Sequence, residues 1–244
     1  MRKNWRIWGI VVFLMVVMLV WKGQICKEEP RMESKVEDEM ENEVAREELE
    51  LEEKIEKEIT DWRLVLVNQE NVLPDDFEIE LTKIDRIREF DVRAIGELKQ
   101  MLEAMKNDGI TNVWVQSAYR SVAHQEELFE RKIKMYEEQG KTREEAEELA
   151  VHTINKPGTS EHNLGLAVDF NYVDYDFDET QGFQWLKENA QKYGFILRYK
   201  KEKEEITKVD YEPWHWRFVG QEHAMKMNEL GMCLEEYVEY LRTN

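Results

Sequence analysis

The chain has 244 residues and a formal net charge of −19 at pH 7, with 53 acidic and 34 basic side chains. Its length suffices for one domain of ordinary size plus appended segments, which excludes a small scaffold held together by disulfides. The two cysteines, Cys26 and Cys233, provide neither a disulfide framework nor a thiolate cluster for a metal. Because phosphate binding requires a concentrated basic face, the acidic excess argues against a nucleic-acid partner.

The start of the chain has the pattern of a membrane anchor. Three basic residues among the first six precede an apolar run that ends before Lys22, and this predicts a single transmembrane segment at 7–22. By the positive-inside rule, residues 1–6 are then cytoplasmic and the chain after the anchor lies outside the membrane. A cleaved signal peptide is the alternative. No small-x-small cleavage site follows the run, however, and Ile25 before Cys26 does not suit lipoprotein processing.

An acidic linker is predicted at 23–60. Within it, residues 27–60 contain 15 acidic and 6 basic side chains, a net charge of −9, and no aromatic residue. Apolar residues recur at intervals of four and seven, which leaves open a helical stalk that self-associates. A solvated and only partly helical tether is the alternative. In either form the segment would keep the following domain, at 61–244, clear of the bilayer.

The first elements of this domain are predicted from apolar periodicity. A strand is expected at 61–68, where apolar and β-branched residues predominate. A helix is expected from about Asp91, which can cap it, to Asn107, because apolar residues recur there at helical spacing. Alternation of apolar and polar residues predicts a second strand at 111–117.

Two charged helices are predicted next. Ser121 can cap a helix at 122–139, and the Thr-Arg-Glu-Glu sequence at 142–145 is a capping box that opens another helix, which runs to about residue 153. A loop containing Pro-Gly then leads to a strand at 166–171.

The last third of the chain is predicted to contain two helices and a β-hairpin. The first helix, at 181–193, ends at Gly194. Strands at 195–199 and 214–219, separated by a charged stretch, are expected to pair as the hairpin. The second helix, at 221–244, has an apolar stripe that indicates a packing role.

Three side chains of this domain have the character of metal ligands. His162, Asp169 and His215 supply two imidazoles and one carboxylate, the set that leaves a tetrahedral zinc ion with one open position for water. Glu212 can then act as the base that takes a proton from this water while the metal polarises a carbonyl, which suits amide hydrolysis. Residues three apart in a regular strand face opposite sides, but Pro213 can begin or bend the strand and so bring Glu212 toward the metal.

Each of these residues also has an interpretation without a metal. A single histidine is more often a loop or buried structural residue than a ligand, and only the joint pattern reverses this expectation. Asp169 lies in an apolar strand, where an inward carboxylate is costly unless it is paired or binds metal; facing outward, it would be only a solvated residue. Cys233 is interpreted as a small core residue. Three histidines are interpreted as surface or helix residues without a metal role: His124, His152 and His223.

Four short motifs occur in an order and spacing that resemble the VanY-type D-alanyl-D-alanine carboxypeptidases. The resemblance covers roughly residues 62–241 and rests on 64–68 with 73–74, on 117–121 with Gln125, on Ser-x-His-x-x-Gly-x-Ala-x-Asp at 160–169 and on Glu-x-Trp-His at 212–215. It implies an α+β fold of the hedgehog-like type, in which helices pack on a central antiparallel sheet. It also implies a single zinc ion and the removal of C-terminal D-alanine from peptidoglycan stem peptides.

The resemblance implies a role for each matching residue. His162, Asp169 and His215 would be the zinc ligands, and Glu212 the catalytic base. Arg120 would steady the substrate and the transition state, which a guanidinium can do through paired, charge-assisted hydrogen bonds. A structural ion pair is the alternative role for Arg120. Four flanking residues resemble substrate-binding positions of the family: Tyr119, Gln125, Ser160 and Trp214.

The expected function is therefore that of a membrane-anchored zinc carboxypeptidase whose catalytic domain lies outside the cytoplasmic membrane. L,D-carboxypeptidase and D,D-dipeptidase activity on the same peptides remain open, because the shape of the pocket decides among the three. A non-catalytic binding or scaffold protein of the cell envelope is the alternative of another class. The presence of Glu212 beside a full ligand set argues against it.

Overall fold

Four short strands form the sheet that positions the rest of the domain. In the computed structural model, which describes residues 46, 61–74 and 76–243, the strand order is β3–β4–β6–β5 and each neighbouring pair is antiparallel. The predicted α+β fold with a central antiparallel sheet is confirmed. The strands are β3 (Val115–Ser117), β4 (Ala167–Phe170), β5 (Phe195–Leu197) and β6 (His215–Phe218).

The register between β4 and β6 separates two kinds of side chain. Val168 is paired with Trp216, and Asp169 is paired with His215. Because successive residues of a strand face opposite sides of the sheet, the apolar pair lies on one face and the polar pair on the other. The apolar face packs in the main core of the domain with Phe170, Phe195, Phe218 and residues of the helices.

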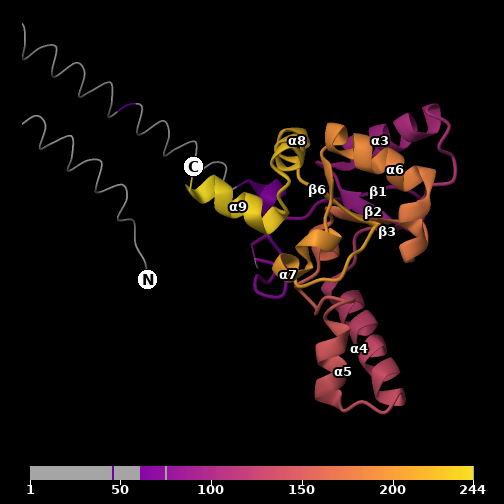
Figure 1. Ribbon diagram of the computed structural model, residues 1–244, viewed down its shortest axis with the longest axis vertical. Coiled ribbons are helices and arrows are strands. Elements are labelled where there is room, and N and C mark those ends of the chain that lie inside the picture. Colours follow the sequence, from indigo (N-terminus) through magenta and orange to yellow (C-terminus); the bar gives the residue numbers. More distant parts are fainter. Residues whose placement is uncertain (1–45, 47–60, 75, 244) are drawn as a thin grey trace, which may run out of the picture. The chain divides into compact units, whose positions relative to one another are not determined.

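Helices cover this core and extend beyond it (Figure 1). Helix α3 buries Leu98, Met101 and Met105, and α6 buries Phe183, Trp185 and Leu186, all in the same core. A second, two-stranded sheet is formed by β1 and β2. The bounds are β1 (Leu81–Lys83), β2 (Glu89–Asp91), α3 (Ile95–Asn107), α4 (Val122–Glu138), α5 (Arg143–Ala150), α6 (Gln181–Asn189), α7 (Glu204–Thr207), α8 (Gln221–Leu230) and α9 (Leu234–Thr243).

Helices α4 and α5 form an antiparallel pair that extends away from the sheet (Figure 1). The pair has its own small core of Phe129, Ile133, Ala146 and Ala150. Both predicted caps are confirmed, since Ser121 accepts a hydrogen bond from the backbone of His124 and the capping box at 142–145 is complete. Helix α5 ends at residue 150, three residues before its predicted end.

The predicted strand at 61–68 is wrong. Residues Trp62–Leu64 form a 3₁₀ turn, because the Asp61 carboxylate accepts a hydrogen bond from the backbone N–H of Arg63 and caps it. The residues that follow the turn form no strand, and the carbonyl groups of Arg63 and Val65 accept hydrogen bonds from the Arg217 side chain. The side chains of Val67 and Leu64 are buried in the main core and in a second core, respectively.

Two helix boundaries also differ from the predictions. Asp91 does not cap α3 but lies buried in β2, where its carboxylate pairs with Arg93, and α3 begins at Ile95. The predicted helix at 221–244 is two helices, because Gly231 adopts the left-handed conformation (φ 66°) and ends α8. Both helices pack in a second core that also contains Leu64 and Ile196.

The predicted hairpin is confirmed as the antiparallel pair β5–β6, with a short 3₁₀ turn and α7 in its connection. Strand β6 begins at His215, two residues after Pro213, as the proline predicts. The helix at 181–193 is α6 continued by a 3₁₀ turn, and it ends at Gly194 with a left-handed φ of 82°.

The predicted anchor at 7–22 lies outside the described residues, as does the predicted stalk at 23–60 except for residue 46. Within the described ranges, no helix combines the length and the apolar character that crossing a bilayer requires.

A substitution at Gly194 tests how closely this glycine packs against β6 and against the start of α8. A Cβ at Gly194 would lie 2.8 Å from the Phe218 ring and 2.9 Å from the backbone of Gly220, whereas a Cβ at Gly109, which has the same φ of 82°, meets nothing within 4 Å. We expect Gly109→Ala to lower the free energy of unfolding by about 1–2 kcal/mol, the cost of the left-handed conformation. Gly194→Ala should lower the free energy of unfolding by about 1–3 kcal/mol more than Gly109→Ala does, because its Cβ overpacks the site. Denaturant unfolding of the full chain in mild detergent measures both, and equal losses would contradict the packing described here.

Candidate metal centre

The two histidines and the aspartate of the predicted ligand set meet at one point. His162 lies in a 3₁₀ turn at Glu161–Leu164, Asp169 in β4 and His215 in β6. One ligand atom from each lies within 4.8 Å of the others, and all three residues are buried. The Asp169 carboxylate lies 3.2 Å from Nε2 of His162 and 3.1 Å from Nδ1 of His215. The predicted convergence of these side chains is therefore observed.

Each imidazole uses its other nitrogen to hold its orientation. Nδ1 of His162 lies 2.7 Å from the carbonyl oxygen of Ala118, to which it can donate. Nε2 of His215 lies 3.3 Å from the carboxylate of Glu161. This leaves Nε2 of His162 and Nδ1 of His215 facing Asp169, and Nε2 of His162 is buried without a hydrogen bond in the described part of the chain. Two oriented imidazoles and a carboxylate fit a zinc ion.

Burial and neighbouring charges set the ionisation of the ligands. Burial, reinforced by Arg120, lowers the pKa of His162 to about 4, so this imidazole is neutral at pH 7. Burial opposes ionisation of Asp169, but the two histidines hold the pKa of its carboxyl well below the usual range. Burial also disfavours protonated His215, yet hydrogen bonds to Asp169 and Glu161 raise its pKa to about 9. A metal that binds Nδ1 of His215 must therefore displace a proton.

Glu212 lies beside the ligands, as Pro213 predicts. Its carboxylate is 3.7 Å from Nδ1 of His215, and its backbone N–H donates to the carbonyl oxygen of Tyr199. Burial, together with the neighbouring Asp169, raises the pKa of Glu212 to about 8, although His215 and Arg120 act to lower it. A carboxyl that titrates near neutral pH can both accept and return a proton, which is what a general base that later acts as an acid requires.

Arg120 connects the ligand set to the cavity around it. Its backbone N–H donates to the carbonyl oxygen of His162, one side-chain nitrogen lies 3.3 Å from Asp169, and another donates to Gln125 at 3.0 Å. Its Nε is buried without a hydrogen-bond partner among the described residues. Arg120 thus has the ion pair of the structural interpretation and still keeps a donor for a ligand.

The four predicted substrate-binding residues line the same cavity, which has a volume of about 500 Å³. Gln125 is buried and donates to the carbonyl oxygen of Asn155 at 2.6 Å. Ser160 is buried, and Trp214 stacks edge-on against Tyr175 with ring centroids 5.3 Å apart. The structure therefore brings all nine predicted residues together: Tyr119, Arg120, Gln125, Ser160, His162, Asp169, Glu212, Trp214 and His215.

Unpaired polar atoms indicate two residues of this cavity that the sequence did not reveal. Among the described residues, four buried side-chain atoms lack a hydrogen-bond partner: Arg120 Nε, Asn155 Oδ1, His162 Nε2 and the Tyr199 hydroxyl. All four residues line the cavity. Buried polar atoms are nearly always paired, so their convergence indicates a polar ligand. Tyr199 and Asn155 belong to no predicted motif, and only their positions, at the end of an expected strand and in an expected loop, could have drawn attention to them.

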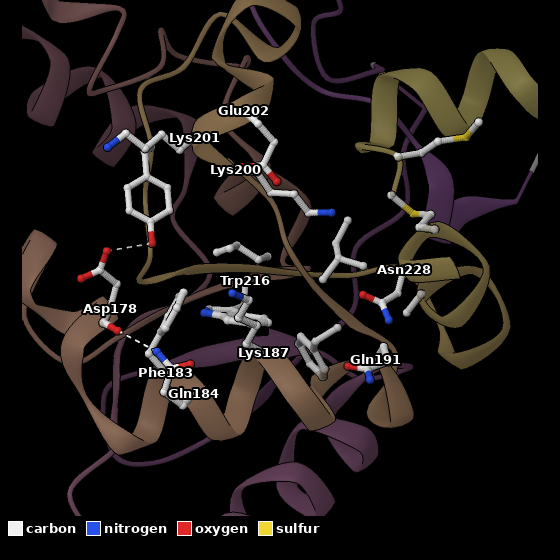
Figure 2. A pocket seen from close by; sticks show the side chains of 17 residues that line it. Asp178, Phe183, Gln184, Lys187, Gln191, Lys200, Lys201, Glu202, Trp216 and Asn228 are labelled. Carbon is white, nitrogen blue, oxygen red and sulfur yellow. Dashed lines mark hydrogen bonds between the residues drawn. The ribbon is translucent and has the colours of Figure 1, made fainter. Parts of the chain in front are cut away.

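The three other histidines do not belong to the ligand cluster. His124 lines the same cavity but is exposed, His152 is exposed, and His223 is buried against Tyr237 and Asp61. A second cavity, of about 440 Å³, is lined by Phe183, Lys187 and Trp216 among others (Figure 2). Because Trp216 faces the side of β6 opposite to His215, this cavity does not share the ligand set.

The family comparison agrees with this site. A model of the VanY family, described as D-alanyl-D-alanine carboxypeptidase, matches residues 88–221, which include every predicted site residue. The chain belongs to the VanY family.

Individual VanY proteins and a related enzyme are similar over most of the described domain. A D-alanyl-D-alanine carboxypeptidase of Enterococcus faecalis is 39% identical over 178 residues, which are 73% of this chain and 66% of the relative. A crystal structure of a mutant VanY D,D-pentapeptidase in complex with Zn(II) is 39% identical, with a TM-score of 0.66, and the match covers 73% of this chain and 99% of that one. The structure of the LdcB LD-carboxypeptidase is 34% identical, with a TM-score of 0.62, covering 72% and 86%. The chain thus spans about two thirds of the curated relative.

Zinc-dependent stability tests the ligand set of this VanY chain. Zinc at about 100 times its Kd should stabilise the wild-type protein by about 2.7 kcal/mol. We expect His162→Ala to lose this gain, because one of the three ligands is removed, and His152→Ala to keep it, because His152 is exposed and remote from the ligand set. Thermal unfolding with zinc and with chelator measures both variants. An undiminished zinc response in His162→Ala would remove this residue from the site.

Proposed function

We propose that this chain is a zinc-dependent carboxypeptidase that removes the C-terminal D-alanine from peptidoglycan stem peptides. The observation that carries the proposal is the buried cluster of His162, Asp169 and His215 with Glu212 3.7 Å from Nδ1 of His215. Membership of a family described as D-alanyl-D-alanine carboxypeptidase, and the Zn(II) complex of a similar structure, support it.

The three metal ligands and Glu212 would have different roles in the hydrolysis. Zinc held by the three ligands would act as a Lewis acid that polarises the scissile carbonyl and acidifies water. Glu212 takes the proton of the attacking water and returns it to the leaving amine, a role that its position beside the three ligands allows. The exclusion of solvent around these buried groups strengthens each electrostatic interaction.

Arg120 and its neighbours suit the end of a peptide chain. A terminal carboxylate or a developing oxyanion requires donors, and Arg120 presents an unpaired Nε in the cavity. The Tyr199 hydroxyl supplies a further donor, and burial raises the pKa of this phenol, so it stays protonated. Asn155 Oδ1 supplies an acceptor for a peptide N–H.

An L,D-carboxypeptidase is the second candidate. The similarity to the LdcB LD-carboxypeptidase favours it, since the same catalytic residues can serve peptides that differ in the residue before the cleaved bond. A D,D-dipeptidase and a non-catalytic envelope protein are outcomes that the assay below separates.

The substrate lies in the cell envelope, so we propose that residues 7–22 anchor the chain with its catalytic domain outside the cytoplasmic membrane. The basic residues before the apolar run support this orientation. The full chain should sediment with membranes and resist extraction by high salt, which removes peripheral proteins, while detergent should release it. Recovery in the soluble fraction would contradict the anchor.

Glu212→Gln tests the catalytic proposal. The variant should bind zinc as the wild type does and release D-alanine from a pentapeptide more slowly by about 10²–10⁴-fold, because the proton acceptor is lost. Asp210→Asn is the matched control, since Asp210 is a neighbouring carboxylate that does not line the cavity. Mass spectrometry of products from the pentapeptide, the tetrapeptide and free D-alanyl-D-alanine identifies which bond is cut.

Four results of that assay have distinct meanings. Wild-type cleavage of the tetrapeptide alone would select the L,D-activity, and cleavage of the free dipeptide the D,D-dipeptidase. Zinc binding without cleavage of any of the three substrates would indicate a non-catalytic binding protein of the cell envelope. Full activity of Glu212→Gln would remove this residue from the mechanism.

A further inference from the structure

Glu161, which no predicted role includes, is the most completely buried carboxylate beside the metal ligands. Its side chain has no exposed surface. One carboxylate oxygen accepts from Nε of Arg198 at 2.7 Å and from Nη1 of Arg217 at 2.9 Å. The other lies 3.3 Å from Nε2 of His215. Buried charges occur almost only when they are paired, and Glu161 has two cationic partners and one imidazole.

The two arginines are themselves fixed, so Glu161 cannot turn away. Arg217 also donates to the carbonyl oxygens of Arg63 and Val65, both at 3.0 Å. Arg198 also donates to Glu235 of α9 at 2.6 and 2.8 Å. Both guanidinium groups are fully buried. The oxygen that faces His215 is therefore held in place by contacts with Arg217 in β6 and with Arg198, which directly follows β5 and is itself bound to α9.

We propose that Glu161 is a positioning residue that fixes the tautomer of His215 and thereby the nitrogen with which His215 binds the metal. The inference rests on the metal site of the proposed function. A carboxylate accepts but does not donate, so Nε2 of His215 carries the hydrogen and Nδ1 presents its lone pair to the metal. His162 obtains the opposite tautomer from the carbonyl oxygen of Ala118. The two histidines thus bind through different nitrogens, each set by its own acceptor.

Replacement of Glu161 by glutamine would invert this hydrogen bond. Arg198 and Arg217 both donate to one oxygen, so the amide oxygen of glutamine would take that position. Its NH₂ group would then face Nε2 of His215 and donate to it. His215 would have to accept there and carry its hydrogen on Nδ1, where the metal binds.

Zinc affinity of the full-length protein, measured by competition with a chelating dye, tests the proposal. We expect Glu161→Gln to bind zinc about 10- to 100-fold more weakly than the wild type. Glu235→Gln is the matched control, because it removes one charge from the same network through Arg198 but does not contact His215. We expect its zinc affinity to stay within about twofold of wild type, whatever it does to the stability of the apo protein.

Each result of the zinc-affinity measurement either supports or overturns the positioning role of Glu161. Wild-type affinity in Glu161→Gln, or an equal loss in both variants, overturns the proposal, because the contact with His215 would then have no effect of its own. If Glu161→Gln does not fold, ¹⁵N NMR of the zinc-loaded wild type decides: a hydrogen on Nε2 of His215 supports the proposal, and a hydrogen on Nδ1 overturns it. A wild type that binds no zinc is a different result, which contradicts the proposed function itself.

Discussion

The antiparallel register of β4 and β6 is the constraint on which the site depends. It places Asp169 directly opposite His215, while Val168 and Trp216 point into the core from the other face. A slip of one residue would bury the polar pair in the core and expose the apolar pair, so core packing enforces the register. The same contacts that stabilise the fold therefore bring two metal ligands together, and Gly165 ends the turn that carries the third, His162.

Ionic groups are buried on the polar face of this strand pair, and their burial costs desolvation free energy. Asp169, Glu161, Arg198 and Arg217 have almost no exposed surface. Such groups are tolerated because they are paired, although apolar residues of the same volume often stabilise a fold more. What the charges provide is position: each imidazole has one acceptor that fixes its ring, and Arg120 connects Asp169 to the substrate cavity. The site is thus preorganised by interactions that contribute little to stability.

The sequence predicted the parts of the site that depend on residue type and local geometry. The ligand set could be proposed because few other roles account for His162, Asp169 and His215 in one ordered pattern, and Pro213 indicated how Glu212 could share their side of the strand. The caps of α4 and α5 followed from Ser121 and from the box at 142–145, because a cap depends only on residues one turn apart.

What the sequence did not predict depends on partners distant in the chain. The run at 61–68 has the composition of a strand, but Arg217 takes the backbone acceptors that a neighbouring strand would need. Asp91 resembles a cap, but it lies buried in β2 and its carboxylate pairs with Arg93. Glu161 stands beside a recognisable ligand, yet its role follows from arginines 37 and 56 residues away. Tyr199 is revealed only by an unpaired hydroxyl in the cavity.

Anomalous diffraction at the zinc absorption edge, from crystals of the zinc-loaded protein, would locate the metal relative to its ligands. We expect a single strong peak at about 2.0–2.2 Å from Nε2 of His162, a carboxylate oxygen of Asp169 and Nδ1 of His215. A zinc ion bound elsewhere, or bound at this site without one of these three residues, would contradict it.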